Sequence, residues 1–289
     1  MKKIIIIVGP TASGKTLLSI EIAKHFGGEI INGDSVQVYK QLNIGSAKIK
    51  HEDMQGIKHH LIDIIDPSKT YSVYQFQRDV RKLFDQIDLP IIVGGTGFYI
   101  NAAISRFEFI EEKRDTTFDQ SFDDLSNEEL YQKLIALDPL IQIDMQNRRR
   151  VLRALEQAMQ GSPRSQKNKK DERLFHPLII YLDLDRKMLK ERLKVRLDHM
   201  LDEGFIEEVK NLRNQNIHLQ AIGYREVDMY LDGIYSYEEM KEAILKASRR
   251  LAKKQKTYFI NQMNPMVFDA ESLTLQEDVK KAIQQYLEV

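Results

Sequence analysis

The feature that most constrains this chain is an octapeptide near its N-terminus, GPTASGKT, which follows the apolar run IIIIV. It fits the pattern G-x-x-x-x-G-K-[ST], which holds phosphate when a buried strand precedes it and a helix follows it. Successive backbone N–H groups point into such a loop, and the helix N-terminus adds positive potential. We therefore expect a P-loop in which Lys15 neutralises phosphate oxygens and Thr16 ligates Mg²⁺. The other loop residues expected to contact phosphate are Gly9, Thr11, Ala12, Ser13 and Gly14. The pattern indicates an oligophosphate without singling out ATP.

Short apolar runs that end near turns continue along the chain, with helical patterns between them. Helices are expected at Thr16–Phe26 and Val73–Ile87. Strands that alternate with helices predict a doubly wound parallel sheet, so the expected fold class is α/β with a P-loop NTPase-like core. The expected strands are Ile4–Val8, Glu29–Asn32, Leu61–Ile65, Pro90–Val93 and Leu178–Leu184.

The alternation of strands and helices breaks after Glu108, where an acidic stretch shows no strand pattern. Helical patterns at Asn127–Leu137 and Asn147–Gln160 follow, and then the polar, basic segment GSPRSQKNKK. We interpret residues 111–174 as a helical insertion in a core formed by 1–110 and 175–289. After the last expected strand the core is predicted to be mostly helical, at Arg186–Leu201, Phe205–Gln215 and Glu238–Asn261.

Composition limits the compartment and the partners. The chain of 289 residues has no cysteine, which excludes disulfides and thiolate metal sites and fits a reducing cytosol. No apolar stretch approaches the roughly 20 residues that a membrane span needs. Lys and Arg together number 43, as do Asp and Glu, so any attraction to nucleic acid must come from local patches. We expect a cytoplasmic monomer without membrane contact.

Two further strand ends carry candidate ligand contacts. Asp34 and Ser35 follow the second strand, at the edge where open α/β sheets bind ligands. The Asp34 carboxylate fits three roles: metal partner, general base or helix cap. The fourth strand ends in Gly94, Gly95, Thr96 and Gly97. The glycines are expected to let backbone approach a ligand closely, and Thr96 offers a neutral hydroxyl.

The fourth strand end also bears on a phosphotransferase interpretation. A P-loop kinase commonly keeps an aspartate at a neighbouring strand end for Mg²⁺, and here that strand end has none. Asp63 and Asp66 remain as candidates for such an aspartate.

Basic residues are segregated on two expected helices of this neutral chain. Arg149, Arg150 and Arg153 share a face of NRRRVLRALE, and LKASRRLAKKQKTYF carries a stripe at helical spacing. Such segregation favours a polyanionic partner, and ordinary solvated helix faces are the alternative. The second stripe consists of Lys246, Arg249, Arg250 and Lys253.

Arginines also follow the last core strand. Arg192 and Arg196 lie at i and i+4 on a helix, within reach of the far end of a diphosphate. Surface pairing with Asp or Glu is the alternative for these two side chains.

Seven segments, in this order and over nearly the whole chain, resemble the tRNA dimethylallyltransferase family, also called IPP transferases. Relatives often have His-Pro where Asp144-Met145-Gln146 stands, and Tyr and Trp where Leu251 and Tyr258 stand, which bears on local tRNA contacts. The carriers are GPTASGKT, GDSVQVYKQLNIGSAK, VGGTGFYI, NRRRVLRALE, RLDHMLDEGFIEEV, AIGYREV and SRRLAKKQKTYF.

The resemblance implies an activity. The P-loop would hold the diphosphate of dimethylallyl diphosphate, with Mg²⁺ assisting. The five-carbon group would pass to N6 of the adenosine 3′-adjacent to the anticodon, in tRNAs reading codons that begin with U. The insertion would grip the anticodon stem-loop. The residues expected along the RNA path are Asp34, Ser35, Val36, Gln37, Thr96, Arg149, Arg150, Arg153, Gly223, Tyr224 and Arg225.

The residues of the site then take roles in alkyl transfer. Lys15 and Arg196 would stabilise the leaving diphosphate, Thr96 would hold an α-phosphate oxygen or the amine, and Asp34 would act as general base. Three alternatives stay open at this point. They are a P-loop small-molecule or nucleotide kinase, an adenylate isopentenyltransferase that uses free AMP or ATP, and a GTPase suggested by NKKD at 168–171.

Overall fold

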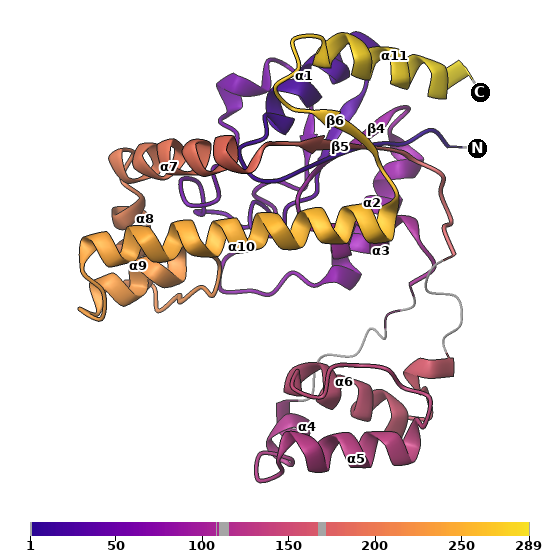
Figure 1. Cartoon of the computed structure of the whole chain (residues 1–289), viewed down its shortest axis with the longest axis vertical. Coiled ribbons are helices and arrows are strands. Elements are labelled where there is room, and N and C mark those ends of the chain that lie inside the picture. Colours follow the sequence, from indigo (N-terminus) through magenta and orange to yellow (C-terminus); the bar gives the residue numbers. More distant parts are fainter. Residues whose placement is uncertain (1, 108, 110–115, 167–171, 289) are drawn as a thin grey trace. The chain divides into compact units, whose positions relative to one another are not determined.

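The computed structural model describes residues 2–107, 109, 116–166 and 172–288. The chain forms two compact units (Figure 1). The core unit comprises Met1–Ile104 and Arg173–Val289, and the inserted unit is Ser105–Glu172. The sequence interpretation placed the insertion at 111–174. The segment NKKD, at 168–171, lies outside the described residues.

Within the described residues, six parallel strands form one sheet in the order β3-β2-β4-β1-β5-β6. Central β1 pairs with β4 on one side and β5 on the other, with Ile6 opposite Ile92 and Ile179. The order of the chain reverses around β1 and β4, so ligand-binding loops meet where their strands end. The strands are β1 Ile5–Val8, β2 Glu29–Asn32, β3 His59–His60, β4 Pro90–Gly94, β5 Leu178–Asp183 and β6 Met266–Asp269.

Helices cover both faces of the sheet because the central strands are apolar on both sides. On one face Ile5 and Ile7 pack with helices α1 (Lys15–Phe26) and α11 (Leu275–Glu288). On the other face Ile4, Ile6 and Val8 pack with three helices (Figure 1). Those three are α2 (Val73–Gln86), α3 (Gly97–Ile104) and the C-terminal half of α10 (Tyr237–Met263).

A further hydrophobic cluster lies beside the sheet, where α10 packs with α7 (Arg186–Asp202) and α9 (Tyr224–Leu231), and α8 (Phe205–Arg213) packs with those two helices (Figure 1). Phe205 and Tyr224 are fully buried in it and meet edge to face, with ring centroids 5.1 Å apart. Leu42, from the segment after β2, belongs to the same cluster.

The inserted unit has a hydrophobic cluster of its own, built by α5 (Asn127–Leu137) and α6 (Arg148–Met159). Ser126 and Glu129 form a capping box at the start of α5, and the Asn147 side chain accepts from Arg150 N at the start of α6. The Arg148 guanidinium donates to the carbonyls of Phe122 and Leu125, which ties α6 to the preceding segment. Short elements α4 (Thr116–Gln120) and η2 (Arg164–Gln166) complete the unit.

The helices that were predicted lie within a few residues of their ranges, whereas α3, α4, α9 and α11 were not predicted and one strand prediction was wrong. The run Leu61–Ile65 is not a strand, since β3 ends at His60 and Leu61 and Asp63 have positive φ of 60° and 54°. Left-handed residues break an extended run, so Ile65 returns only as an isolated bridge to Tyr39. The sequence also gave no sign of β6, whose four residues are mostly exposed at the sheet edge. In the described part of the chain, no helix has the length and apolarity to cross a membrane.

Candidate active site

The segment between β1 and α1 forms the predicted P-loop. Gly14 caps the helix at φ 85°, and a Cβ there would meet nothing within 4 Å. Ala12 also has a left-handed φ, 69°, which turns neighbouring N–H groups toward the loop interior. Gly9 is required for packing, because a Cβ would lie 2.7 Å from the Leu182 carbonyl oxygen. The Lys15 Nζ donates to the Pro10 carbonyl at 2.6 Å, within its own loop.

A cavity of about 270 Å³ opens at this loop. Burial and, to a smaller extent, the nearby Arg196 lower the pKa of Lys15 to about 7, and Asp34 opposes the shift. Burial also lowers the pKa of the Arg196 guanidinium, again against the effect of Asp34. Two cations and one carboxylate thus share a space that is short of anionic charge, as a diphosphate site requires. Its walls include residues 11–16 and Asn32, Asp34, Gln37, Gly94, Gly95, Arg196 and Gln255.

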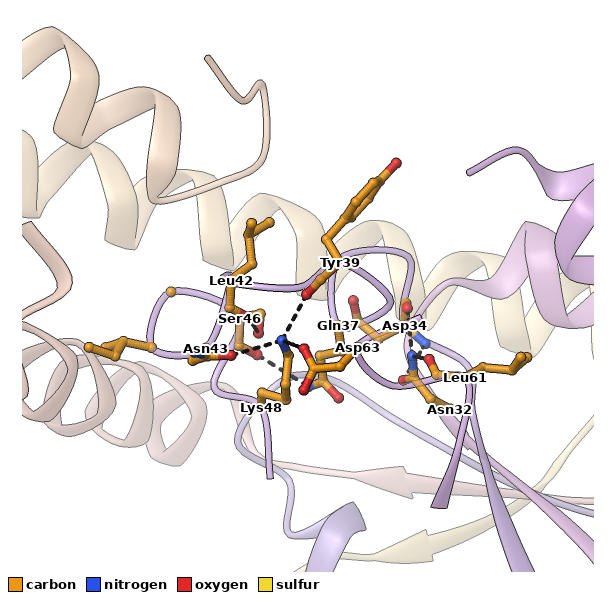
Figure 2. Close-up of polar contacts among 12 residues, drawn as sticks. Asn32, Asp34, Gln37, Tyr39, Leu42, Asn43, Ser46, Lys48, Leu61 and Asp63 are labelled. Carbon is orange, nitrogen blue, oxygen red and sulfur yellow. Dashed lines mark hydrogen bonds and ion pairs between the residues drawn. The ribbon is translucent and has the colours of Figure 1, made fainter. Parts of the chain in front are cut away.

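Asp34 is held at the end of β2. The Oδ1 oxygen of Asp34 accepts from Val36 N at 2.8 Å, and the backbone N–H of Asp34 donates to Asn32 Oδ1 at 3.0 Å. Asn32 is buried and also donates to the carbonyls of Asp34 and Leu61 (Figure 2). The hydrogen bond from Val36 N thus occupies only one of the two carboxylate oxygens of Asp34. Oδ2 has no hydrogen-bond partner among the described residues, so that oxygen is left for a ligand.

Thr96 connects the ends of β2 and β4. Its Oγ1 accepts from Ser35 N at 3.1 Å and contacts the Ser35 hydroxyl at 3.3 Å. Its N–H donates to the Gly33 carbonyl at 3.1 Å. Thr96 therefore orders the turn that carries Asp34, in addition to the ligand contact predicted for it.

Gly94 and Gly95, at the end of β4, line the cavity as predicted, and together with Gly97 they also make room for other parts of the protein. A Cβ at Gly94 would lie 2.2 Å from the Gly33 backbone, and one at Gly95 2.3 Å from Gln255 Nε2. At Gly97 a Cβ would lie 2.4 Å from the Tyr258 ring. Each glycine accommodates another part of the protein, because the two strand ends and α10 pack too closely for side chains.

Two charged side chains brace the segment from Val36 to Lys48. The Lys48 ammonium, 4% exposed, donates to the Tyr39 carbonyl, Asn43 Oδ1 and Asp63 (Figure 2). From α8, the Glu208 carboxylate accepts from the N–H groups of Asn43, Ile44 and Gly45 at 2.7–3.0 Å, and from the Tyr224 hydroxyl at 2.7 Å. These contacts fix the wall of the cavity that contains Gln37 and Ser46.

Arg192 and Arg196 lie at different depths on α7. Arg192 donates to the Ala12 carbonyl at 3.3 Å and pairs with Glu271, so it supports the P-loop from outside. Arg196 lines the cavity and donates to the Ser46 carbonyl at 3.5 Å. The structure thus distinguishes the predicted diphosphate ligand from its surface-paired neighbour.

A second, mainly apolar cavity of about 160 Å³ adjoins the first. Thr11, Asp34, Ser46 and Arg196 line both, so the groups able to do chemistry lie where the two cavities meet. The other walls of the second cavity include Val36, Leu197, Met200, Ala221, Ile222, Gly223, Leu245 and Leu251.

The predicted RNA-path residues at 223–225 fall into different environments. Gly223 lines the apolar cavity, and its N–H donates to Glu226 at 2.7 Å. Tyr224 is 1% exposed, so its side chain packs inside the protein and is not open to an RNA surface. Arg225 is exposed and pairs with Glu226.

Exposed basic groups lie on both predicted helices. In the inserted unit Arg149 and Arg150 are exposed, and Arg153 pairs with Glu156 at 2.8 Å. In the core unit all four residues of the α10 stripe, Lys246, Arg249, Arg250 and Lys253, are exposed.

The residues offer Mg²⁺ a hydroxyl and a carboxylate. The exposed Thr16 lines the cavity together with Asp34, and Mg²⁺ is usually held by one or two such groups plus substrate phosphates. Asp63 is engaged by Lys48, and Asp66 accepts from Ser68 at the surface, so neither supplies the aspartate of a kinase site. No cluster of three or more acidic or histidine side chains suited to a metal occurs in the described ranges.

Sequence reasoning missed Asn32, Glu208 and Gln255, all of which shape the cavity or its wall. Glu208 lay within a quoted motif, DEGFIEEV, and Gln255 within another, LAKKQKTYF. Neither motif reveals which distant segment its polar side chain meets.

Comparisons with known proteins identify the family of the chain. The family model described as IPP transferase matches residues 37–262. A tRNA dimethylallyltransferase of Acholeplasma laidlawii is 48% identical over 289 residues, covering 100% of both chains. The one of Bacillus subtilis is 42% identical, covering 97% of this chain and 95% of its own.

Solved structures give the same result. The tRNA isopentenylpyrophosphate transferase of Bacillus halodurans superposes with a TM-score of 0.78 at 37% identity, covering 100% of this chain and 97% of its own. A eukaryotic dimethylallyltransferase acting on tRNA reaches a TM-score of 0.84 at 28% identity, covering 99% of this chain and 78% of its own. The fold and the site define a P-loop transferase with an inserted helical unit. Within that class, the chain belongs to the IPP transferase family.

Proposed function

We propose that this protein transfers the dimethylallyl group of dimethylallyl diphosphate to N6 of the adenosine 3′-adjacent to the anticodon. The acceptors are tRNAs reading codons that begin with U, and diphosphate is released. The observation that carries the proposal is the meeting of Lys15, Arg196 and Asp34 in one cavity of an IPP transferase family member. The enzyme acts as a monomer in the cytoplasm.

The P-loop side of the cavity holds the leaving group. Lys15, Arg196 and the loop N–H groups stabilise the charge that grows on the diphosphate as the carbon–oxygen bond breaks. Mg²⁺, held by Thr16 and the diphosphate oxygens, would supply further stabilisation of that charge. These groups would bind a diphosphate either as a leaving group or as part of a phosphoryl donor. They therefore suit a diphosphate ester and do not require phosphoryl transfer.

Asp34 takes the proton. The N6 amine attacks the allylic carbon, the new C–N bond forms as the C–O bond breaks, and the Oδ2 oxygen of Asp34 accepts one amine proton. The target base must leave its stack to reach the cavity, as in other enzymes that act on a base. The apolar cavity beside Asp34 suits a flat purine entering from the side of Ala221 and Gly223.

The exposed basic residues bind the RNA backbone. Arg149 and Arg150 of the inserted unit, with the α10 stripe, contact phosphates of the anticodon stem-loop. Each phosphate contact releases roughly one counterion. Affinity for the stem-loop should therefore fall steeply between 50 and 200 mM salt, measured by filter binding; a flat dependence would remove this role from the stripes.

The alternatives lack support at the site. A kinase interpretation explains Lys15, Thr16 and Arg196, but its candidate aspartates lie outside the cavity lining. An acceptor as small as AMP would leave the exposed basic residues without a partner. The guanine-nucleotide motif lies outside the described residues and stays a prediction against which a binding assay can be run.

The test is incubation with radiolabelled dimethylallyl diphosphate, Mg²⁺ and an unmodified anticodon stem-loop. We expect label on the loop adenosine. The Asp34→Asn variant should lower kcat by about 10²–10⁴-fold while stem-loop affinity is retained. Phosphorylation of an acceptor from ATP, with the prenyl ester untouched, would overturn the proposal.

A further inference from the structure

Gln255 is a buried amide in the cavity wall that the chemistry above does not use. It lies on α10, is 8% exposed and lines the cavity that contains Lys15 and Asp34. Its Nε2 donates to the Gly95 carbonyl at 3.0 Å. Its Oε1 is buried and has no hydrogen-bond partner among the described residues. A buried acceptor without a donor is costly, so it calls for a ligand.

The surroundings of Gln255 connect it to the reacting groups. Gly95 has no side chain where a Cβ would lie 2.3 Å from Gln255 Nε2, so the glycine makes room for this amide. The next residue, Thr96, donates its N–H to the Gly33 carbonyl at 3.1 Å, and Gly33 directly precedes Asp34. The amide and the carboxylate are therefore attached to two strand ends that are hydrogen-bonded to each other.

The free oxygen selects the chemistry of its partner. An amide oxygen only accepts hydrogen bonds, so it repels the oxygens of a diphosphate. It suits an N–H donor, and the exocyclic amine of adenine has two N–H groups, of which Asp34 takes one. This reasoning rests on the proposed function.

We propose that Gln255 Oε1 accepts the second N–H of the N6 amine of the acceptor adenine. In the step, the C–N bond forms from the nitrogen lone pair, and the C–O bond breaks with its electron pair leaving on diphosphate. Asp34 receives one amine proton. The other hydrogen stays on nitrogen throughout and donates to Gln255, which stabilises the positive charge that nitrogen carries in the transition state.

The test compares Gln255→Met, which keeps the length and volume of the side chain, with Gln262→Met at an exposed position of the same helix. Single-turnover label transfer is measured at saturating stem-loop and prenyl donor. We expect Gln255→Met to lower the rate constant by about 10- to 100-fold, the effect of losing one hydrogen bond to a charged group. Gln262→Met should match the wild type.

A second variant perturbs the Gln255 amide by changing Gly95, the residue whose carbonyl accepts its hydrogen bond. Gly95→Ala leaves every polar group in place but displaces Gln255, and it should lower the rate constant in the same direction. If Gln255→Met does not fold, as judged by its melting temperature, Gln255→Asn withdraws the oxygen by one methylene and gives the same readout.

The binding measurements separate this role from service to the leaving group. Affinity for inorganic diphosphate and the half-saturating Mg²⁺ concentration should equal those of the wild type. A rate constant within twofold of the wild type, or a loss that follows a weaker Mg²⁺ or diphosphate affinity, would overturn the inference. Absence of transfer by the wild type itself would instead overturn the proposed function.

Discussion

Two strand ends of this protein are rich in glycine, and they use it for opposite purposes. After β1, Gly14 has a left-handed φ of 85° and open space where a Cβ would be, so its backbone is uncovered at the cavity. At the end of β4, Gly94 and Gly95 have protein atoms 2.2 and 2.3 Å from where their Cβ atoms would lie. Both ends line the cavity, but the first leaves its backbone uncovered there, whereas the second lets β2, β4 and α10 approach one another.

The difference shows that a glycine cluster does not by itself identify a ligand site. At the first end, Gly14 has a backbone conformation that glycine adopts most readily, next to empty space. At the second end, Gly94 allows two backbone segments to approach each other closely. Substitutions at the first end should affect mainly binding and catalysis. At the second end, substitution of Gly94, where a Cβ would meet the Gly33 backbone, should affect mainly the free energy of unfolding.

The largest effect is expected from Lys15→Met at the P-loop. Removing the ammonium should lower kcat/KM for label transfer by roughly 10²–10³-fold, as for loss of one group that stabilises a leaving anion. The free energy of unfolding, measured by urea titration, should not fall, because the buried cation has no carboxylate partner within 4 Å among the described residues. A large loss of stability would contradict the contrast between the two ends.

Gly94→Ala should produce the reverse pattern. Its Cβ would overlap the Gly33 backbone, which has little freedom to move, so we expect a loss of about 2–3 kcal/mol in the free energy of unfolding. Urea titration measures it. Wild-type stability in this variant would mean that the strand ends separate easily, and the packing role of the glycine would be lost.

Gly14→Ala sharpens the comparison because it changes conformation without adding a clash. A left-handed alanine costs about 1–2 kcal/mol, and there is space for its methyl group. We expect a modest drop in melting temperature together with weaker diphosphate binding, followed by calorimetry. The matched variant Gly27→Ala has φ 69° and open space at the far end of α1, so it should lose similar stability with unchanged diphosphate binding.

The smallest effect concerns pH. The pKa of Lys15 is about 7 in the free protein, and a bound diphosphate favours the charged form and raises that pKa. The contribution of Lys15 to affinity is therefore complete below pH 7 and declines as pH rises toward the pKa of the complex, by at most about tenfold per pH unit. Diphosphate affinity of the wild type, divided by that of Lys15→Met at each pH, isolates this term. A constant ratio between pH 6 and 9 would be the contrary result.

Much of the site was predictable where the chemistry is local. The P-loop pattern fixed Lys15 and Thr16, and the rule on strand ends brought Asp34 to the same edge of the sheet. Contacts over long sequence distances were not predictable. Gln255 meets Gly95 160 positions away, and Glu208 meets Asn43 165 positions away.

The wrong strand at Leu61–Ile65 has a similar cause. Its apolar residues fit a strand pattern, yet the Leu61 carbonyl is bound by Asn32 and Asp63 by Lys48, which hold the segment in a turn. Such tertiary contacts override a local preference for extended structure. The roles of Arg192 and Arg196 could likewise be told apart only once the structure showed that Arg196 lines the cavity and Arg192 pairs with Glu271.

The Glu208 carboxylate accepts hydrogen bonds from three successive N–H groups, at residues 43–45, and these contacts have a consequence for biosynthesis. The P-loop and Asp34 leave the ribosome before α8 is made, but the segment that encloses them is held by the Glu208 carboxylate, which is made more than 160 residues later than that segment. A nascent chain that ends before α8 therefore exposes a phosphate-binding turn without its enclosure. Productive chemistry begins only once the C-terminal helices have emerged and docked.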